Sequence, residues 1–421
     1  MSKVKLYNFQ KSILDLTKDR NRVAYYMEMG TGKTFVGSEK MKQLGSKINL
    51  LICQKSKVQD WINHFEEYYS EYKIIDLTKE KQDVLLEGIT EKTIYVINYE
   101  LTFRRKYLSF LRNFTLILDE SSLIQNEKAK RTKFILNLNP ENIILLSGTP
   151  VGGKYENLWS QCRLLGWYIS KNEYWVNYIR TRLIEVNGFY LPIVTGYQNI
   201  SELKNNLRDH GAVFLKSSDV LDLPEQTFTK QYVEPIKEYK KFKKDLFIKI
   251  NEDELVGDNI LKRMLYERQL CGQYNKNKLD ALKELLESTE DRIIIFYNFT
   301  KEKDLIVSLC EKLKKPYSII NGEIKNLEAY NSSKNSVTIV QYQAGSMGLN
   351  LQKANKIIYF TLPLSSELFE QSKKRIHRIG QLDTCFYYYL ITKGTIEEKI
   401  LKTLEMRKDY TNELYREENY D

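Results

Sequence analysis

The sequence has few of the residues that build covalent or metal-based sites. Its 421 residues include 5 cysteines and 3 histidines, and no two cysteines show the Cys-x-x-Cys spacing. We therefore expect neither a disulfide framework nor a zinc site. No apolar run approaches the ~18–20 residues that cross a membrane, and the mean hydropathy is −0.48. Because the N-terminus also lacks an apolar signal segment, the sequence predicts a cytoplasmic protein with no membrane partner.

Basic residues outnumber acidic ones. Lys plus Arg number 65 and Asp plus Glu 55, which gives a net charge of +10 at pH 7. A basic balance favours partners with a phosphate backbone, because each phosphate that is neutralised releases counterions. Lys237–Lys249 concentrates this charge in a helical pattern, and two interpretations stay open: a solvated helix face or a DNA-facing surface.

Short apolar runs alternate with amphipathic stretches in two parts of the chain. Such a rhythm predicts a parallel sheet covered by helices on both faces, so the fold class is α/β with two such units in one chain. The expected strands are Val23–Tyr26, Ile48–Cys53, Thr93–Asn98, Phe114–Leu118 and Ile143–Ser147 in the first part, and Arg292–Tyr297, Tyr317–Ile320, Ser336–Val340, Lys356–Phe360 and Cys385–Leu390 in the second. Helical patterns cover Gly32–Leu44 and Val58–Tyr69.

The stretch between these parts has another character. We expect helices at Asn157–Leu165 and Trp167–Ile179, and a hairpin or extended excursion at Leu183–Gly196, which carries glycines and a proline. The predicted domains are a first lobe at 1–215, a helical connector at 216–275 and a second lobe at 276–421.

A glycine-rich loop is the strongest local signal. Met29–Thr34 (MGTGKT) follows an expected strand and opens a helix, which is the context of a phosphate-binding loop. Lys33 would bind the β- and γ-phosphates of ATP, and the Thr34 hydroxyl would help to hold Mg²⁺. The full pattern has glycine where this chain has Met27.

The Asp119-Glu120 pair supplies the second half of such a site. It ends an apolar strand, and a carboxylate at the carboxyl end of a strand beside the phosphate loop is where a Mg²⁺ ligand lies. Asp119 is therefore the expected metal ligand, and Glu120 the residue that orients the attacking water.

Further segments extend this pattern along nearly the whole chain. Together with the phosphate loop, they resemble the motif series of a superfamily-2 helicase of the Swi/Snf type. They are Gln10 in LYNFQ, Leu51–Ser56, Leu145–Pro150, Ile293–Phe299, Gln343–Asn350 and Gln371–Gln381. The His-Arg-Ile-Gly-Gln core, His377–Gln381, is the mark of the Swi/Snf branch.

The resemblance implies roles for individual residues. The implied nucleotide-binding set is Gln10, Met29, Gly30, Thr31, Gly32, Lys33, Thr34, Asp119, Gly348 and Asn350; the nucleic-acid contacts are Lys55, Ser56, Asn98, Tyr99, Gln343 and Gly345; the coupling residues are Ser122, Ser147, Thr149 and Gln371.

Two arginines complete the expected catalytic set of Lys33, Glu120, Arg375 and Arg378. Gln371, Arg375 and Arg378 are spaced i, i+4, i+7, so we expect them on one face of a helix. Two guanidinium groups suit phosphate oxygens, and the resemblance makes Arg378 the arginine finger and Arg375 its neighbour. His377 is expected to be structural.

The chain departs from the family pattern at two places. The family follows Asp-Glu with Ala-His, whereas this chain has Ser121 and Ser122; it also has Gln341-Tyr342 where the family has Ser-Thr. A serine hydroxyl can form a hydrogen bond in place of the histidine but has a shorter reach, so the efficiency of coupling is in question. The chain has little room for chromatin-reading modules, which favours a bare motor of prokaryotic or viral origin.

The expected function is a DNA-dependent ATPase that translocates on duplex DNA, hydrolyses ATP between its two lobes, needs Mg²⁺ and acts as a monomer. Little sequence specificity is expected, because such motors contact the backbone. Two alternatives stay open: a strand-separating DNA or RNA helicase, and a nucleic-acid-binding regulator with a vestigial ATPase. The pathway and any protein partner do not follow from the sequence.

Overall fold

The computed structural model describes residues 4–79, 91–151, 154–186, 189–221, 223–345 and 349–415. The chain forms two compact units, Met1–Leu221 and Asp222–Lys408. Each has its own parallel sheet and its own hydrophobic cores.

The first unit is built on one parallel sheet. Its central strands are apolar and almost wholly buried, as is typical of a sheet covered on both faces. In the described part of this unit, the strand order is β3 (Lys73–Asp76), β4 (Thr93–Asn98), β2 (Ile48–Cys53), β5 (Phe114–Asp119), β6 (Asn142–Ser147), β1 (Arg22–Met27) and β9 (Ala212–Leu215).

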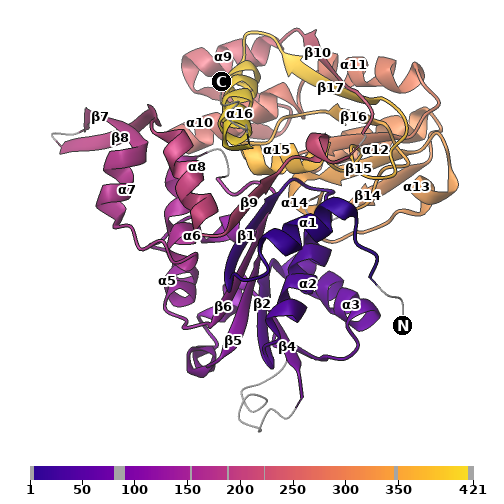
Figure 1. Cartoon of the computed structure of the whole chain (residues 1–421). Coiled ribbons are helices and arrows are strands. Elements are labelled where there is room, and N and C mark those ends of the chain that lie inside the picture. The colour runs from indigo at the N-terminus through magenta and orange to yellow at the C-terminus, as the bar shows by residue number, and fades with distance from the viewer. Residues whose placement is uncertain are drawn as a thin grey trace, which may run out of the picture. The chain divides into compact units, whose positions relative to one another are not determined.

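Helices cover both faces of this sheet (Figure 1). One face carries α1 (Asn8–Leu16), α2 (Lys33–Leu44) and α3 (Val58–Tyr68); the other carries α5 (Lys130–Leu136), α6 (Trp159–Leu164), α7 (Lys171–Tyr178) and α8 (Ile200–Asp209). Successive strand residues alternate between the two cores, as with Tyr25 and Tyr26. β1 therefore packs against both cores, and the glycine-rich loop follows its carboxyl end.

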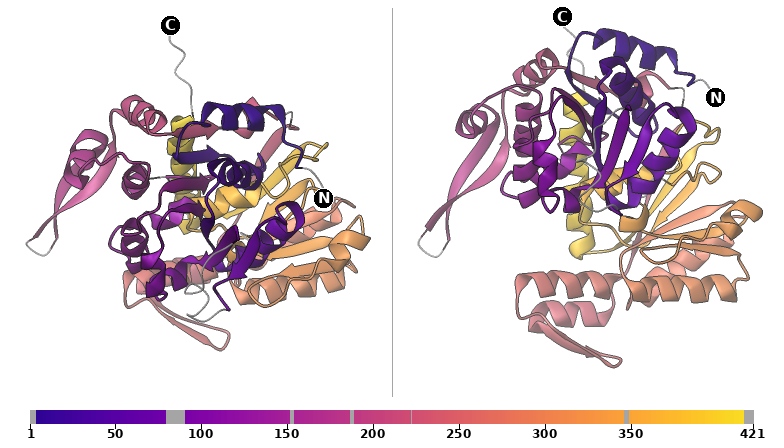
Figure 2. Two further views of the ribbon diagram at one scale, coloured as in Figure 1. Left: turned by 60° about the horizontal axis from the view of Figure 1, so that its bottom comes forward. Right: turned by 90° about the horizontal axis from the view of Figure 1, so that it is seen from below.

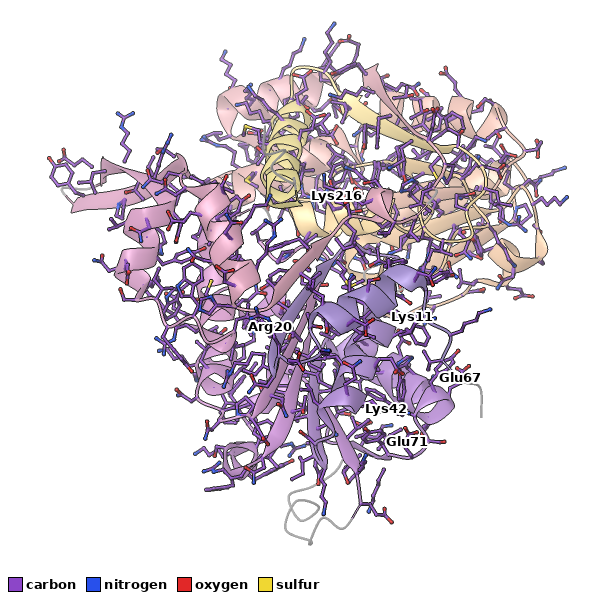
Figure 3. All side chains as sticks on the ribbon, in the orientation of Figure 1. Lys11, Arg20, Lys42, Glu67, Glu71 and Lys216 are labelled. Atoms are coloured by element: carbon purple, nitrogen blue, oxygen red, sulfur yellow. The ribbon has the colours of Figure 1, made fainter. Side chains whose placement is uncertain are left out.

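Surface contacts join elements at the periphery of this unit. Lys42 and Glu71, both labelled in Figure 3, form an ion pair of 2.9 Å between α2 and the segment after α3. Arg20 donates to the Asp209 carbonyl oxygen at 2.6 Å. The Lys42–Glu71 pair is exposed and contributes at most about 1 kcal/mol, so the buried cores hold the unit together.

An antiparallel ribbon of β7 (Ile179–Val186) and β8 (Phe189–Tyr197) projects from the first unit (Figure 2). The expected hairpin at Leu183–Gly196 is confirmed and is longer at its N-terminal end. The ribbon is anchored at its base, where the rings of Tyr155 and Tyr197 lie 4.9 Å apart. Farther out, Leu183 and Tyr190 are 62% and 68% exposed.

The second unit repeats the architecture. In its described part, the parallel strand order is β10 (Gln226–Val233), β17 (Cys385–Thr392), β16 (Lys356–Tyr359), β13 (Ile293–Tyr297), β15 (Val337–Gln341) and β14 (Tyr317–Ile320). One face packs against α11 (Lys276–Glu287) and α12 (Thr300–Lys312), the other against α13 (Glu328–Ser332), α14 (Tyr342–Gly345), α15 (Ser366–Lys373) and α16 (Ile396–Tyr415). The α/β fold with two parallel sheets is thus confirmed.

A smaller cluster adjoins this sheet. It contains α9 (Lys237–Asp245), the ribbon of β11 (Phe247–Ile250) and β12 (Asp253–Val256), and α10 (Ile260–Cys271). The helix expected over Lys237–Lys249 is wrong at its end: Leu246 adopts φ 57 and caps α9, and Lys249 lies in β11. The left-handed residue ends the helical hydrogen bonding and turns the chain into the ribbon.

Some expected elements differ from the observed ones. The helix expected from Trp167 begins only at Lys171, because the Ser170 hydroxyl accepts from the Glu173 amide and caps it there. The segment 216–275, expected to be helical, also contains β10, β11 and β12. Among the described residues, no helix combines the length and apolar character needed to cross a bilayer.

Candidate nucleotide site

The glycine-rich loop joins β1 to α2 through a turn that favours glycine. Gly30 and Gly32 adopt φ 88 and 81, values in the left-handed region that disfavour other residues. A Cβ on Gly32 would lie 2.3 Å from Nε2 of Gln10. The loop therefore packs closely against α1 and opens α2, the arrangement that suits phosphate binding at a helix N-terminus.

Gln10 lies directly against this loop. Its Oε1 accepts from the Tyr7 amide at 2.9 Å, and its Nε2 donates to the Thr31 carbonyl oxygen at 2.9 Å. The side chain is only 3% exposed. Gln10, one of the predicted nucleotide-binding residues, thus lies at the loop, and its hydrogen bond to Thr31 also fixes the loop backbone.

Lys33 and Thr34 begin α2 beside the ends of two strands. Lys33 Nζ donates to the Met27 carbonyl oxygen at 2.8 Å, and a Cβ on Gly148 would lie 3.2 Å from Nζ. Gly148 follows β6, and because it has no Cβ it leaves room for the lysine. The same Cβ would lie 3.1 Å from Met29 Cγ, so the loop and the segment after β6 are in close contact.

Asp119 ends β5, and its carboxylate is oriented by a tryptophan. Trp61 Nε1 on α3 donates to Asp119 Oδ2 at 2.7 Å, and the Tyr99 hydroxyl donates to the Asp119 carbonyl oxygen at 3.0 Å. Trp61 is not among the site residues predicted from the sequence. A carboxylate and the Thr34 hydroxyl are hard oxygen donors of the type that Mg²⁺ prefers, so the residues present fit this ion.

Glu120 holds a strained backbone and accepts two hydroxyl hydrogen bonds. Its φ is 57, which costs a non-glycine residue about 1–2 kcal/mol. Its Oε1 accepts from Ser147 Oγ at 2.5 Å and from Ser122 Oγ at 3.0 Å. Burial raises the pKa of this carboxyl, and the charge of Lys33 and the Ser147 hydrogen bond oppose the rise.

The predicted coupling residues of this unit gather around Glu120. Ser147 Oγ also accepts from the Thr149 amide at 3.1 Å, so Ser122, Ser147 and Thr149 are connected to one carboxylate. Gln161 extends this network and was not predicted. Its Oε1 accepts from Ser121 Oγ at 2.7 Å and from Tyr26 at 2.9 Å, and its Nε2 donates to the Pro150 carbonyl oxygen.

The second unit holds two arginines without an acidic partner among the described residues. Arg375 is 2% exposed, and only Nη1 has an acceptor, the Leu349 carbonyl oxygen at 3.5 Å; Nε and Nη2 have none within the described chain. Burial and, secondarily, Arg378 lower its pKa to about 10. Burial also lowers the pKa of the half-buried Arg378. Buried guanidinium nitrogens without acceptors favour an anionic ligand.

The helix expected to carry both arginines ends before them, so this prediction is wrong. α15 stops at Lys373, whose carbonyl oxygen accepts from the Tyr387 hydroxyl at 3.0 Å. Gln371 alone lies on the helix and donates to Glu367 at 3.0 Å, whereas Arg375 and Arg378 follow in turns.

Other predicted residues of this unit lie nearby. The Leu351 amide donates to the Arg375 carbonyl oxygen at 3.2 Å, which brings Asn350 beside the arginine segment. Gly348 lies outside the described residues. His377 contacts the Pro224 carbonyl oxygen through Nε2 at 2.9 Å, consistent with a structural role.

The residues predicted to contact nucleic acid differ in their exposure to solvent. Lys55, Ser56 and Gln343 are exposed, and Gly345 ends α14. The prediction is wrong for the side chains of Asn98 and Tyr99, which are 3% and 0% exposed. Tyr99 instead supports Asp119, and Asn98 donates to Glu100 at 2.7 Å.

Two family models match consecutive parts of the chain. Residues 25–279 match the SNF2-related domain, and residues 277–380 match the helicase conserved C-terminal domain. The mouse SWI/SNF-related matrix-associated actin-dependent regulator of chromatin subfamily A member 1 is 23% identical over 90% of this chain and 40% of its own length. An uncharacterized ATP-dependent helicase of Mycoplasma genitalium is 24% identical over 91% of this chain and 39% of its own length.

Among solved structures, the Sulfolobus solfataricus SWI2/SNF2 ATPase core in complex with dsDNA has a TM-score of 0.47 and 21% identity, over 97% of this chain and 93% of that one. This chain spans about two fifths of the length of the two relatives above.

Two RecA-like sheets and the matched domains define a protein of the helicase-like class. Since the first match alone covers residues 25–279, the chain belongs to the SNF2-related family.

Proposed function

We propose that this protein is a DNA-dependent ATPase that translocates on duplex DNA. The observation that carries the proposal is the group formed by Lys33, Asp119 and Glu120 at the carboxyl ends of the strands of the first sheet, where Lys33 lies beside Gly148 and Glu120 accepts from Ser147. A vestigial site would retain no need for this group, nor for two arginines without acidic partners in the described part of the second unit.

Each candidate site residue of the first unit has its own role in the proposed hydrolysis. The loop and Lys33 bind the phosphates of ATP. Thr34 and Asp119 would hold Mg²⁺, which neutralises charge on the phosphates when bound. Glu120 orients the attacking water; its hydrogen bond from Ser147 stabilises the ionised carboxylate against the effect of burial. The hydrogen bond from Trp61 fixes the orientation of the Asp119 carboxylate.

The second unit supplies the complementary charge. Arg375 and Arg378 stabilise the negative charge that develops on the γ-phosphate, so hydrolysis requires both units. The membership of the family and the net charge of +10 support a nucleic-acid track, and exposed Lys55, Ser56 and Gln343 are the proposed backbone contacts. We further propose that the motor acts as a monomer in the cytoplasm.

The experiment is ATP turnover measured with duplex DNA, single-stranded DNA, RNA and no polymer. Duplex DNA should stimulate turnover most, and stimulation should grow with duplex length. Displacement of the third strand from a DNA triplex, without separation of a forked duplex, would report translocation. Turnover that responds to none of the polymers overturns the proposal.

Variants locate the activity in the described site. Lys33→Ala and Glu120→Gln should lower stimulated turnover by at least ~10²-fold, and Arg378→Ala by ~10³-fold or more with nucleotide binding retained. Lys11→Ala is the matched control, because this lysine is exposed on α1 of the same unit, and it should leave turnover unchanged.

One structural feature favours a second candidate function. The β7–β8 ribbon, with exposed Leu183 and Tyr190, has the form of a strand-separating element. Unwinding of a forked duplex would support a helicase in place of a duplex translocase.

A further inference from the structure

A groove on the second unit is lined mainly by lysines that the family motifs do not use. It lies between α9 and the turn from β17 to α16 and has a volume of about 470 Å³. Four lysines line it, Lys240, Lys243, Lys244 and Lys393, against one acid, Glu234. We refer to it as the lysine groove. The cluster of α9, α10 and the β11–β12 ribbon can be followed in Figure 2.

The cationic charge of the lysine groove is available to a ligand. All four lysines are exposed, and within the described chain none of them forms an ion pair or a side-chain hydrogen bond. Elsewhere on the second unit, lysines form ion pairs, such as Lys301 with Asp253 at 2.6 Å. A surface that keeps its lysines unpaired retains attraction for an anion.

The charge extends beyond one cavity, which indicates a polymeric ligand. Lys393 also lines a second cavity of about 470 Å³ with Lys230 and Lys402, and Lys243 lines a third with Arg263 and Lys399. A small anion would need only one of these positions. Neighbouring cavities that share Lys393 and Lys243 suit the repeated charges of a phosphate backbone.

Acidic residues also line these cavities, but they are fewer than the basic ones. Eight lysines and arginines stand against four glutamates, Glu234, Glu267, Glu398 and Glu405. Glu405 already pairs with Lys230 at 2.9 Å. A net positive charge therefore remains, and the lysine groove itself has four lysines against Glu234 alone.

The walls of the lysine groove are held in place by buried contacts. The Tyr239 hydroxyl accepts from the Ile396 amide at 2.9 Å, and Tyr239 and Phe242 are 3% and 0% exposed. The Lys393 amide donates to the Val233 carbonyl oxygen at 2.9 Å. A preformed groove loses little conformational freedom on binding.

We propose that the lysine groove binds the backbone phosphates of duplex DNA, as a contact additional to those of the family motifs. This inference rests on the proposed function, because it assumes that duplex DNA is the track. Lysines contact phosphates as point charges without reading bases, so the contact carries affinity and no sequence preference.

The experiment compares two triple variants of the full chain. The test variant is Lys240→Ala, Lys243→Ala and Lys393→Ala. The control variant removes the same charge elsewhere on the second unit, with Lys283→Ala, Lys312→Ala and Lys334→Ala, all exposed. Binding of a fluorescent duplex and duplex-stimulated turnover are measured from about 0.05 to 0.2 M salt.

The test variant should bind duplex DNA on the order of tenfold more weakly per lost phosphate contact at about 0.1 M salt, and its log–log salt slope should be shallower by about 0.9 per contact. Turnover without DNA should not change, and the maximal stimulated turnover should be recovered at saturating DNA. The control variant should retain a steeper slope than the test variant.

Two outcomes separate the proposals. If duplex DNA stimulates the unmodified protein but both variants have the same affinity and slope, the lysine groove is only a solvated face and the inference fails alone. If duplex DNA does not stimulate the unmodified protein, the proposed function fails first.

Discussion

Glu120 shows how single residues adapt the site to the absence of the family's histidine. Ser122, which replaces that histidine, donates to Glu120 Oε1, and Ser147 donates to the same oxygen. The Ser147 hydroxyl thus connects the Glu120 carboxylate to the end of β6, and the Ser122 hydroxyl connects it to the segment after β5. Because a hydroxyl does not titrate near neutral pH, this connection does not depend on the protonation of a histidine.

Trp61 should control the affinity for Mg²⁺ through Asp119. Trp61→Phe keeps an aromatic ring but removes the Nε1 donor, which lies 2.7 Å from Asp119 Oδ2. We expect the Mg²⁺ concentration for half-maximal turnover to rise by about 10–100-fold, as is usual when a residue that orients a metal ligand is lost. Turnover at saturating Mg²⁺ should fall less. A Mg²⁺ titration of ATPase activity measures both.

The matched control is Trp159→Phe. Its Nε1 donates to the Ile169 carbonyl oxygen at 3.1 Å, so the same atom is lost from the same unit away from Asp119. A Mg²⁺ requirement that rises equally in both variants would show general damage and contradict the positioning role.

Residues that act through local motifs could be predicted, and residues that act through tertiary contacts could not. Asp119 and Glu120 stand at the end of a strand and Lys33 at the start of the helix that follows another, positions that neighbouring residues determine. Trp61 and Gln161 reach the site only after helices pack on the sheet, and their spacing indicates no more than a buried face. Asn98 and Tyr99 were predicted to contact nucleic acid, but their side chains at the end of β4 are buried.

Elements at the borders of the sheets were the hardest to predict. β10 is an edge strand whose residues are mostly exposed, so it lacks the apolar run that reveals a buried strand. The arginine segment has a helical spacing, yet the Tyr387 hydroxyl takes the Lys373 carbonyl and turns replace the last part of the helix. The predicted bounds of central strands such as β2 and β4 matched the structure, because burial on both faces requires an apolar composition.

The β7–β8 ribbon should be dispensable for the stability of the first unit. Beyond its base it has exposed side chains, and a lone two-stranded ribbon is at best marginally stable. Replacing Arg182–Ile193 with Gly-Ser-Gly should change the free energy of unfolding by less than about 1 kcal/mol, and duplex-stimulated turnover should persist. Chemical denaturation and the ATPase assay check both.

The base of the ribbon provides the contrast. Tyr197 packs on Tyr155 and donates to Glu156 at 2.9 Å, so Tyr197→Ala should cost about 2 kcal/mol. If shortening the ribbon abolishes unwinding of a forked duplex that the intact protein performs, the ribbon is a separating element and the helicase alternative gains support.

The whole molecule combines two units that each have a complete core. Each sheet is covered on both faces by its own helices. The second unit also holds a buried ion pair, in which Lys278 Nζ on α11 lies 2.6 Å from both carboxylate oxygens of Glu397 on α16. Both side chains are almost fully buried, 0% and 3% exposed, so this pair connects distant parts of one unit.

Breaking this pair should destabilise the second unit by itself. Lys278→Met leaves the Glu397 charge buried with the Thr392 amide as the one remaining donor to its carboxylate among the described residues, which costs about 3–5 kcal/mol. In a unit of this size the corresponding fall in the unfolding temperature is on the order of 10 °C. Calorimetry of the full chain should show one transition moved to lower temperature and one unchanged.

The control is the same substitution on the same helix. Lys283 is half exposed and lies 3.9 Å from Glu287, so Lys283→Met should cost less than about 0.5 kcal/mol. A single transition that moves as a whole in Lys278→Met would mean that both units unfold together. An unchanged melting profile would mean instead that a neighbouring group or water compensates Glu397, and that the ion pair does not stabilise the second unit.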